Sequence, residues 1–171
     1  MNSSIPFASK SDEEAFFQLV TSGLLGPLNF DLSPEEVIAL LGKPDKVARP
    51  PHERDKDKLV NLFYRNILVS FSDMRLAMFH INFRGSQQGL PEPLQATWHE
   101  AIRRIDLDTF VAYLKEHGIR CQYVVADDAV KDVICLHQSG LEVIFDSDRE
   151  YKIRQITSTR LGLGNRRFRD C

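Results

Sequence analysis

The sequence contains no long hydrophobic run, and its uninterrupted apolar stretches are only a few residues long, as at residues 77–79. A transmembrane helix needs about 20 predominantly apolar residues in succession, so we expect no helix that crosses a membrane. Residues 1–10 also lack a basic segment followed by an apolar one. That absence argues against a secretory signal.

Neither sign of charge is in excess. Lysine and arginine number 22 and aspartate and glutamate number 24, which gives a formal net charge of -2. This balance argues against a generally basic nucleic-acid-binding surface, and a hydrophobic content of 43% argues against a disordered chain. A length of 171 residues fits one domain, so we predict a single domain over residues 1–171.

Cysteine is scarce: the chain has Cys121, Cys135 and Cys171, without a Cys-x-x-Cys pair. An odd number of cysteines without an export signal predicts free thiols in a reducing compartment, which means a cytoplasmic location.

Signatures of common enzyme classes are missing as well. Residues 137–140 contain a serine but not the Gly-x-Ser-x-Gly elbow of hydrolases. Gly162 and Gly164 form a Gly-x-Gly that does not lead from a strand into a helix with a third glycine. We therefore expect a non-catalytic protein without a cofactor.

What the sequence does contain is a weak internal repeat. Four features recur in the same order at an offset of about 75 residues: residues 31–42 and 106–118, residues 67–71 and 141–145, Asp73 and Asp148, and Ile81 and Ile156. A β-bulge or a longer turn would explain the small drift of the offset. The sequence predicts a pseudo-repeat over residues 11–84, a linker over 85–93, a second pseudo-repeat over 94–160 and a flexible tail over 161–171.

Each predicted unit places helices before strands. Capping patterns at Ser11–Glu14 and Ser33–Glu36 predict two helix starts, and the period-2 alternation of apolar residues predicts strands over 59–65, 67–72 and 75–84. In the second unit we expect helices over 94–104 and 106–118, and strands near 120–125, 132–138, 140–146 and 150–158. This order favours an α+β fold with an antiparallel sheet and helices on one of its faces.

The segment Leu32–Asp45, with its Leu-Gly-x-Pro end, resembles the helix motif of the β-lactamase-inhibitor-protein-like fold, which BamE-like lipoproteins share. Tyr64 and the run Val69–Leu76 match the strands that follow this motif in that family. The chain is also similar to small bacterial cytosolic proteins of the immunity type. This resemblance implies a tandem fold that binds another protein, such as a toxin or an enzyme.

The strand alternation also predicts which side chains face away from the helices. Such a mixed face of apolar, aromatic and charged side chains suits a protein-binding surface. Its candidate residues are Tyr64, Leu68, Met78, His80, Asn82, Ile144, Lys152 and Arg154.

Two other functions stay open at this stage. A small metal-dependent hydrolase would use Asp127, Asp128, Asp146 or His137, and an RNA-associated factor would use the arginine-rich tail from Arg166. We expect no bound metal, although one Cys2His2 set has ligand types that zinc prefers. That set is His117, Cys121, Cys135 and His137.

Overall fold

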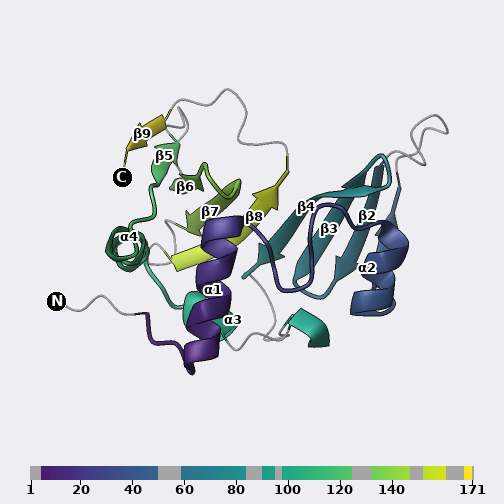
Figure 1. Ribbon diagram of the computed structural model, residues 1–171, viewed down its shortest axis with the longest axis horizontal. Coiled ribbons are helices and arrows are strands. Elements are labelled where there is room, and N and C mark those ends of the chain that lie inside the picture. Colours follow the sequence, from purple (N-terminus) through teal and green to yellow (C-terminus); the bar gives the residue numbers. More distant parts are fainter. Residues whose placement is uncertain are drawn as a thin grey trace.

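The computed structural model describes residues 5–49, 59–83, 90–94, 98–124, 132–146, 152–160 and 168–170. Helical segments come in two groups, each before a group of strands (Figure 1). The first group is α1 (Lys10–Ser22) and α2 (Pro34–Leu41), and the second is η2 (Glu92–Leu94), α3 (Trp98–Ile102) and α4 (Leu107–Glu116).

The described strands form one nine-stranded sheet in which every neighbouring pair is antiparallel, in the order β1-β2-β3-β4-β8-β7-β6-β5-β9. The α+β class with an antiparallel sheet is therefore confirmed. The strands are β1 (Lys46–Ala48), β2 (Leu59–Tyr64), β3 (Ile67–Ser72), β4 (Arg75–Asn82), β5 (Gln122–Val124), β6 (Val133–Leu136), β7 (Leu141–Asp146), β8 (Lys152–Thr159) and β9 (Phe168–Asp170).

The β3–β4 hairpin follows the predicted alternation. Ile67, Val69 and Phe71 are buried, whereas the residues between them are half-buried. The turn places Asp73 at φ 49° and Met74 at φ 60°. Two successive positive φ angles are typical of the hairpin turn whose twist matches that of the flanking strands.

Irregular register interrupts the pairing of two strand pairs in the sheet. The register between β3 and β4 shifts between Ser70 and Phe71, and the register between β7 and β8 shifts between Ile144 and Phe145. The two halves meet where β4 pairs with β8, and Ile81 lies opposite Ile156 there.

The predicted helix starts are correct at one position and wrong at another. Ser33 and Glu36 form the expected capping box of α2, with both hydrogen bonds present. The N-cap of α1 is Ser9 rather than Ser11, because the Ser9 hydroxyl accepts from the backbone N–H of Asp12. Helix α1 therefore begins two residues earlier than the sequence pattern indicated.

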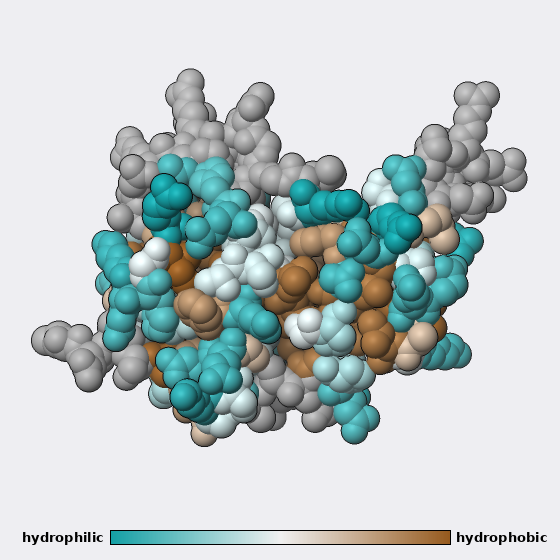
Figure 2. All heavy atoms as spheres, in the orientation of Figure 1, coloured by the Kyte–Doolittle hydropathy of each residue, from teal (hydrophilic) through white to brown (hydrophobic). Residues whose placement is uncertain are grey.

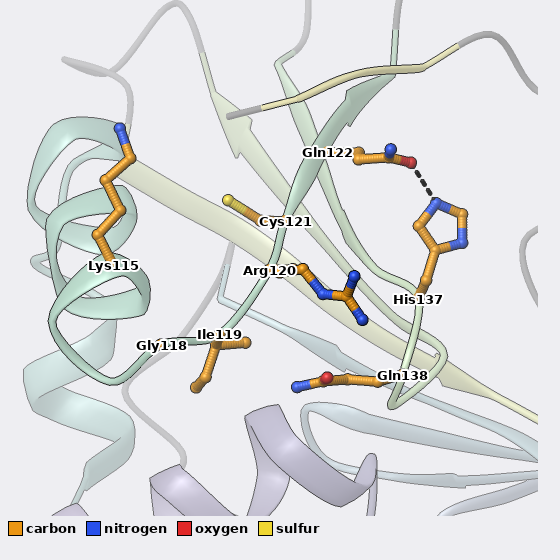
Figure 3. Close-up of a pocket in the computed structure, with 8 residues that line it drawn as sticks. All are labelled: Lys115, Gly118, Ile119, Arg120, Cys121, Gln122, His137 and Gln138. Atoms are coloured by element: carbon orange, nitrogen blue, oxygen red, sulfur yellow. Dashed lines mark hydrogen bonds between the residues drawn. The ribbon is translucent and has the colours of Figure 1, made fainter.

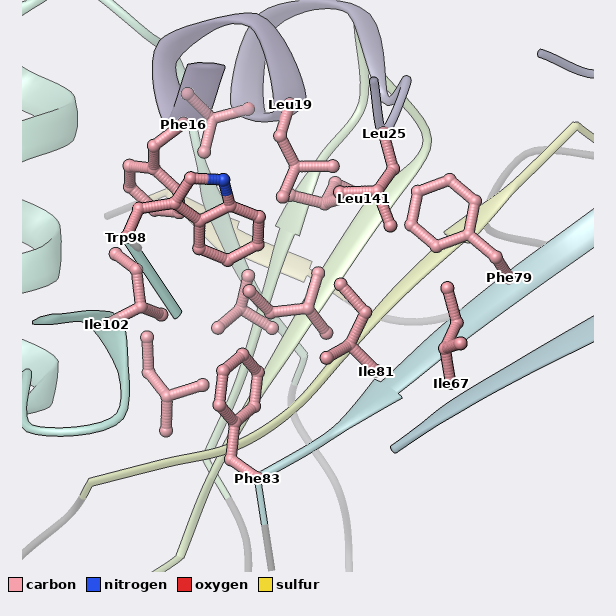
Figure 4. Packing of buried hydrophobic residues seen from close by; sticks show 14 of the residues in the cluster. Phe16, Leu19, Leu25, Ile67, Phe79, Ile81, Phe83, Trp98, Ile102 and Leu141 are labelled. Carbon is pink, nitrogen blue, oxygen red and sulfur yellow. The ribbon is translucent and has the colours of Figure 1, made fainter. Parts of the chain in front are cut away.

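Helix α1 packs against the second group of helices and strands. The Phe16 ring lies 5.7 Å from the Trp98 ring and 5.6 Å from the Tyr113 ring, between centroids. At the end of α1, the Ser158 hydroxyl donates to the carbonyl of Gly23 at 2.7 Å. Figure 4 shows Phe16 and Leu19 of α1 beside Trp98 and Leu141 in the core.

A buried carboxylate joins α1 to α3. Asp12 is 5% exposed, and its Oδ1 accepts from the backbone N–H of Trp98 at 3.0 Å. The Ser9 hydroxyl donates to Asp12 Oδ2 at 2.7 Å. Hydrogen bonding to its ionised form lets a carboxylate remain stable in a buried position.

Three segments differ from the sequence expectation. The helix expected over 94–104 is the 3-10 turn η2 and the short α3, Trp98–Ile102. Strand β1 lies before the polar segment where no strand was expected, and β9 lies in the predicted tail. Both are short strands paired at or near a sheet edge, where apolar alternation is not needed. Most of the predicted linker and tail lies outside the described residues.

On the face turned to the viewer in Figures 1 and 2, hydrophobic side chains gather between α1 and α2, around the segment that joins the two helices. Phe30, Leu32 and Leu40 are partly buried there and pack against the core. None of the described helices is both long and apolar enough to cross a membrane.

Candidate functional site

The sheet face opposite the buried core positions is the first candidate site, and we call it the outer face. Register pairs place Leu68 opposite His80, and Ser70 opposite Met78. Leu68, Met78 and His80 are half-buried and alternate with buried residues along β3 and β4. We call these three residues the outer-face cluster.

Other residues that were predicted for the outer face lie outside this cluster. Asn82 is exposed at the end of β4, and Ile144 is half-buried on β7. Lys152 lies at the start of β8 beside Asp106, the N-cap of α4, and helps to lower the pKa of Asp106 after the hydrogen bonds from Thr109. Lys152 therefore lies close to the start of α4 and outside the outer-face cluster.

Tyr64 is a correction to the predicted face. Its side chain is 3% exposed and its hydroxyl has no hydrogen-bond partner. Tyr64 pairs with the buried Ile67, so the two side chains share the core face. Burial, followed by the nearby charge of Asp45, raises the pKa of Tyr64 to about 12.

The outer face gains one residue pair that the sequence analysis missed. The Lys46 ammonium of β1 lies 5.6 Å from the centroid of the Phe63 ring, on β2. Phe63 alternates with the buried Leu62 and Tyr64. A correct register for β2 would have assigned Phe63, rather than Tyr64, to the outer face.

His80 is the titratable centre of the outer-face cluster. Burial lowers the pKa of His80, and the positive charge of Arg154 lowers it further. Arg154 lies at the bulge of β8, where its carbonyl accepts from the N–H of Phe83. At neutral pH the cluster therefore combines two apolar side chains, a neutral imidazole and one nearby guanidinium.

A second candidate site is a cavity of about 600 Å³ beside the C-terminal end of α4, which we call the β5–β6 cavity (Figure 3). The imidazole Nε2 of His137 and the Oε1 of Gln122 are joined by a hydrogen bond of 2.6 Å. The cavity is lined by Lys115, Gly118, Ile119, Arg120, Cys121, Gln122, His137 and Gln138.

A third site is a cavity of about 510 Å³ between the start of α1 and α4, which we call the α1–α4 cavity. Its lining includes Lys10, Glu13, Tyr113, Glu116 and His117. Burial raises the pKa of Tyr113 to about 12, and the charges of Glu13 and Glu116 act in the same direction. The Tyr113 hydroxyl is buried and has no hydrogen-bond partner.

The four candidate zinc ligands have other surroundings. The Nδ1 of His117 hydrogen-bonds the carbonyl of Tyr113 at 2.9 Å, and His137 is bound to Gln122. Cys121 is in a disulfide, whereas Cys135 is a fully buried thiol. In the part of the chain that the structure describes, no three side chains of His, Cys, Asp or Glu form a group that could hold a metal ion.

The remaining chemical candidates are only partly described. Asp146 is 4% exposed and ends β7. Asp127, Asp128 and the tail arginines from Arg166 to Arg167 lie outside the described residues. The described residues therefore give no structural support to the hydrolase hypothesis or to the RNA-binding hypothesis.

The disulfide of Cys121 is a correction to the expected free thiols, and it predicts a redox-dependent stability. Reduction should lower the free energy of unfolding by about 2–4 kcal/mol, because the bond restricts the unfolded chain. Thermal unfolding with and without a dithiol reductant measures this. Cys135→Ala should keep the response to the reductant, and Cys121→Ala should remove it. Equal responses of both variants would contradict the prediction.

Comparison of this chain with protein-family models, with curated proteins and with solved structures finds no match.

Proposed function

We propose that this protein is a non-catalytic protein-binding module that covers a partner protein with the outer face of its sheet, as an immunity or inhibitor protein does. The outer-face cluster is the observation that supports the proposal. Leu68 lies opposite His80 across β3 and β4, and Met78 lies two residues before His80 on β4. All three are half-buried and are bordered by polar residues such as Ser70 and Thr157. An apolar centre with a polar rim is typical of protein interfaces.

In this proposal the helices cover one face of the sheet and leave the outer face to the partner. Support comes from the contacts of α1, whose Phe16 packs with Phe110 of α4 and whose end is bonded to Ser158. Phe110 in turn lies 5.7 Å from Phe145, a core-face residue of β7. The helices therefore pack against the strand residues that alternate with the outer-face cluster and lie on the opposite face of the sheet.

We further propose that the sheet arose from two tandem units. The bulges before Phe71 and Phe145 support this, because they occupy equivalent places in the repeat. The pairing of Ile81 with Ile156 also fits, since repeat-related residues meet there as they would on a two-fold axis. Two units joined edge to edge would give a partner a broader face than either could alone.

The cluster also indicates the chemistry of the partner. Its apolar atoms favour an apolar contact, and the Arg154 guanidinium beside His80 favours a carboxylate at the edge of that contact. We therefore propose a partner surface with an apolar centre flanked by an aspartate or a glutamate.

The proposed cytoplasmic location of the protein depends on the redox state of Cys121. A cytoplasmic location was expected from free thiols, and a disulfide is more typical of an oxidising compartment. We keep the cytoplasm as a proposal that holds only where Cys121 is reduced in the cell.

Met78→Asp and Leu68→Asp should each weaken partner binding by at least about 100-fold, which corresponds to about 2.7 kcal/mol. Each change places a carboxylate at the centre of the contact, where its desolvation has no compensation. Native mass spectrometry of complexes captured with the wild-type chain identifies the partner, and calorimetric titration of the purified pair measures the loss.

Ile38→Asp is the matched control, because Ile38 is 38% exposed on α2 and lies away from the outer face. This variant should bind as the wild type does, and circular dichroism should show all three variants folded. A partner that binds Met78→Asp and Leu68→Asp as tightly as the wild type would refute the sheet-face proposal.

A further inference from the structure

The β5–β6 cavity has a distinctive charge. Among the described residues that line it, Lys115 and Arg120 are cationic and none is a carboxylate. Both side chains are exposed. An anion in the cavity would therefore meet the positive charge of these two described side chains.

Polar groups converge on one side of this cavity. Figure 3 shows the Arg120 guanidinium directed toward the space between His137 and Gln138. The bond to Gln122 fixes the ring of His137, so this wall is held in place before any ligand arrives. A guanidinium beside an amide can hold a carboxylate or a phosphate through two parallel hydrogen bonds.

The remaining wall of the cavity is apolar. Ile119 is 5% exposed and follows the left-handed Gly118, whose φ is 67°. Cys121, at 8% exposure, continues this wall. A cavity of about 600 Å³ with an apolar wall and a few placed polar groups has the size and character of a small-molecule site.

The α1–α4 cavity is a natural comparison. It has nearly the same volume, but its lining contains Glu13 and Glu116 beside Lys10. The two carboxylates would oppose an anion there. The same small anion should therefore distinguish the two cavities.

We propose that the β5–β6 cavity binds a small organic anion, a carboxylate or a phosphate ester on an apolar stem. Arg120 pairs with the anionic group, the Gln138 amide donates to it, and Ile119 contacts the stem. This site uses none of the residues of the outer-face cluster. The two proposals can therefore fail separately.

The test uses benzoate and phenyl phosphate as probes, with benzamide as the uncharged counterpart of benzoate. Titration followed by backbone amide NMR should show saturable shifts centred on residues 118–122 and 137–138, with a Kd on the order of 1 mM. Benzamide should bind at least about tenfold more weakly. A preference between the two anions identifies the anionic group that the site accepts.

Arg120→Ala and Arg120→Gln should each weaken binding of the preferred anion about tenfold or more, which corresponds to about 1.4 kcal/mol. Two variants are used so that a folding defect in one does not decide the result, and the NMR spectra report the fold directly. Lys10→Ala, in the α1–α4 cavity, is the matched control and should leave the Kd unchanged.

Three results would overturn the proposal. One is the absence of shifts with either anion up to about 20 mM, well above the expected Kd. The second is equal binding of benzamide and benzoate. The third is a set of shifts that centres on the α1–α4 cavity or that Arg120→Ala leaves unchanged.

Discussion

Substitution of Gly23 by alanine is expected to lower the free energy of unfolding by about 2–4 kcal/mol. Gly23 ends α1 at φ 71°, where an L-residue with a Cβ is strained by about 1 kcal/mol. A Cβ at this position would also lie 2.1 Å from the backbone oxygen of Ser139 and 2.9 Å from the Ser158 hydroxyl. Because a backbone oxygen cannot rotate away, α1 must separate from the sheet, and overpacking of this kind costs a further 1–3 kcal/mol or so.

Gly118→Ala is the matched control for this prediction. Gly118 also follows a helix, at φ 67°, but a Cβ there would have no atom within 4 Å. Its substitution should cost only the backbone strain, about 1 kcal/mol. Thermal and urea unfolding of both variants measure the difference, with about 2–4 °C of Tm expected per kcal/mol for a chain of this size. Similar losses in the two variants would mean that α1 is not held against Ser139 and Ser158.

Local sequence patterns predicted most elements of the fold because local physics determines them. The alternation at Ile67, Val69 and Phe71 fixes which face of β3 is buried, and Ser33 with Glu36 fixes the start of α2. The alternation of Val60, Leu62 and Tyr64 along β2 places Tyr64 on the buried face, and Tyr64 was misplaced because the prediction left the register of β2 relative to β3 open.

Long-range features were beyond the reach of these patterns. The contact of α1 with Trp98 and Tyr113 joins residues that are about 80 to 100 positions apart. Similarly, the sequence suggested free thiols because spacing says nothing about the surroundings of Cys121. The β5–β6 cavity was missed for the same reason, since the pairing of β5 with β6 brings Arg120 and His137 to the same cavity.

Phe16→Ala is expected to have an effect at least as large as that of Gly23→Ala, about 3–5 kcal/mol of unfolding free energy. The Phe16 side chain is fully buried, and its ring lies within 6.4 Å of four other aromatic rings, between centroids. Removal of this ring leaves a cavity among side chains from α1, α3 and α4. Phe17→Ala is the neighbouring control: Phe17 is 39% exposed, with its ring 5.6 Å from that of His117, and its loss should cost less than about 1 kcal/mol.

The same variant tests whether the two halves of the sheet unfold together. Because α1 belongs to the first half of the sequence but packs on the second, loss of Phe16 should weaken both halves at once. Urea unfolding of Phe16→Ala, followed by tryptophan fluorescence of Trp98 and by far-ultraviolet circular dichroism, should therefore show a single transition with an unchanged m value. Two separate transitions would mean that the β1–β4 half is stable without the packing of α1, and that the continuous sheet is not one cooperative unit.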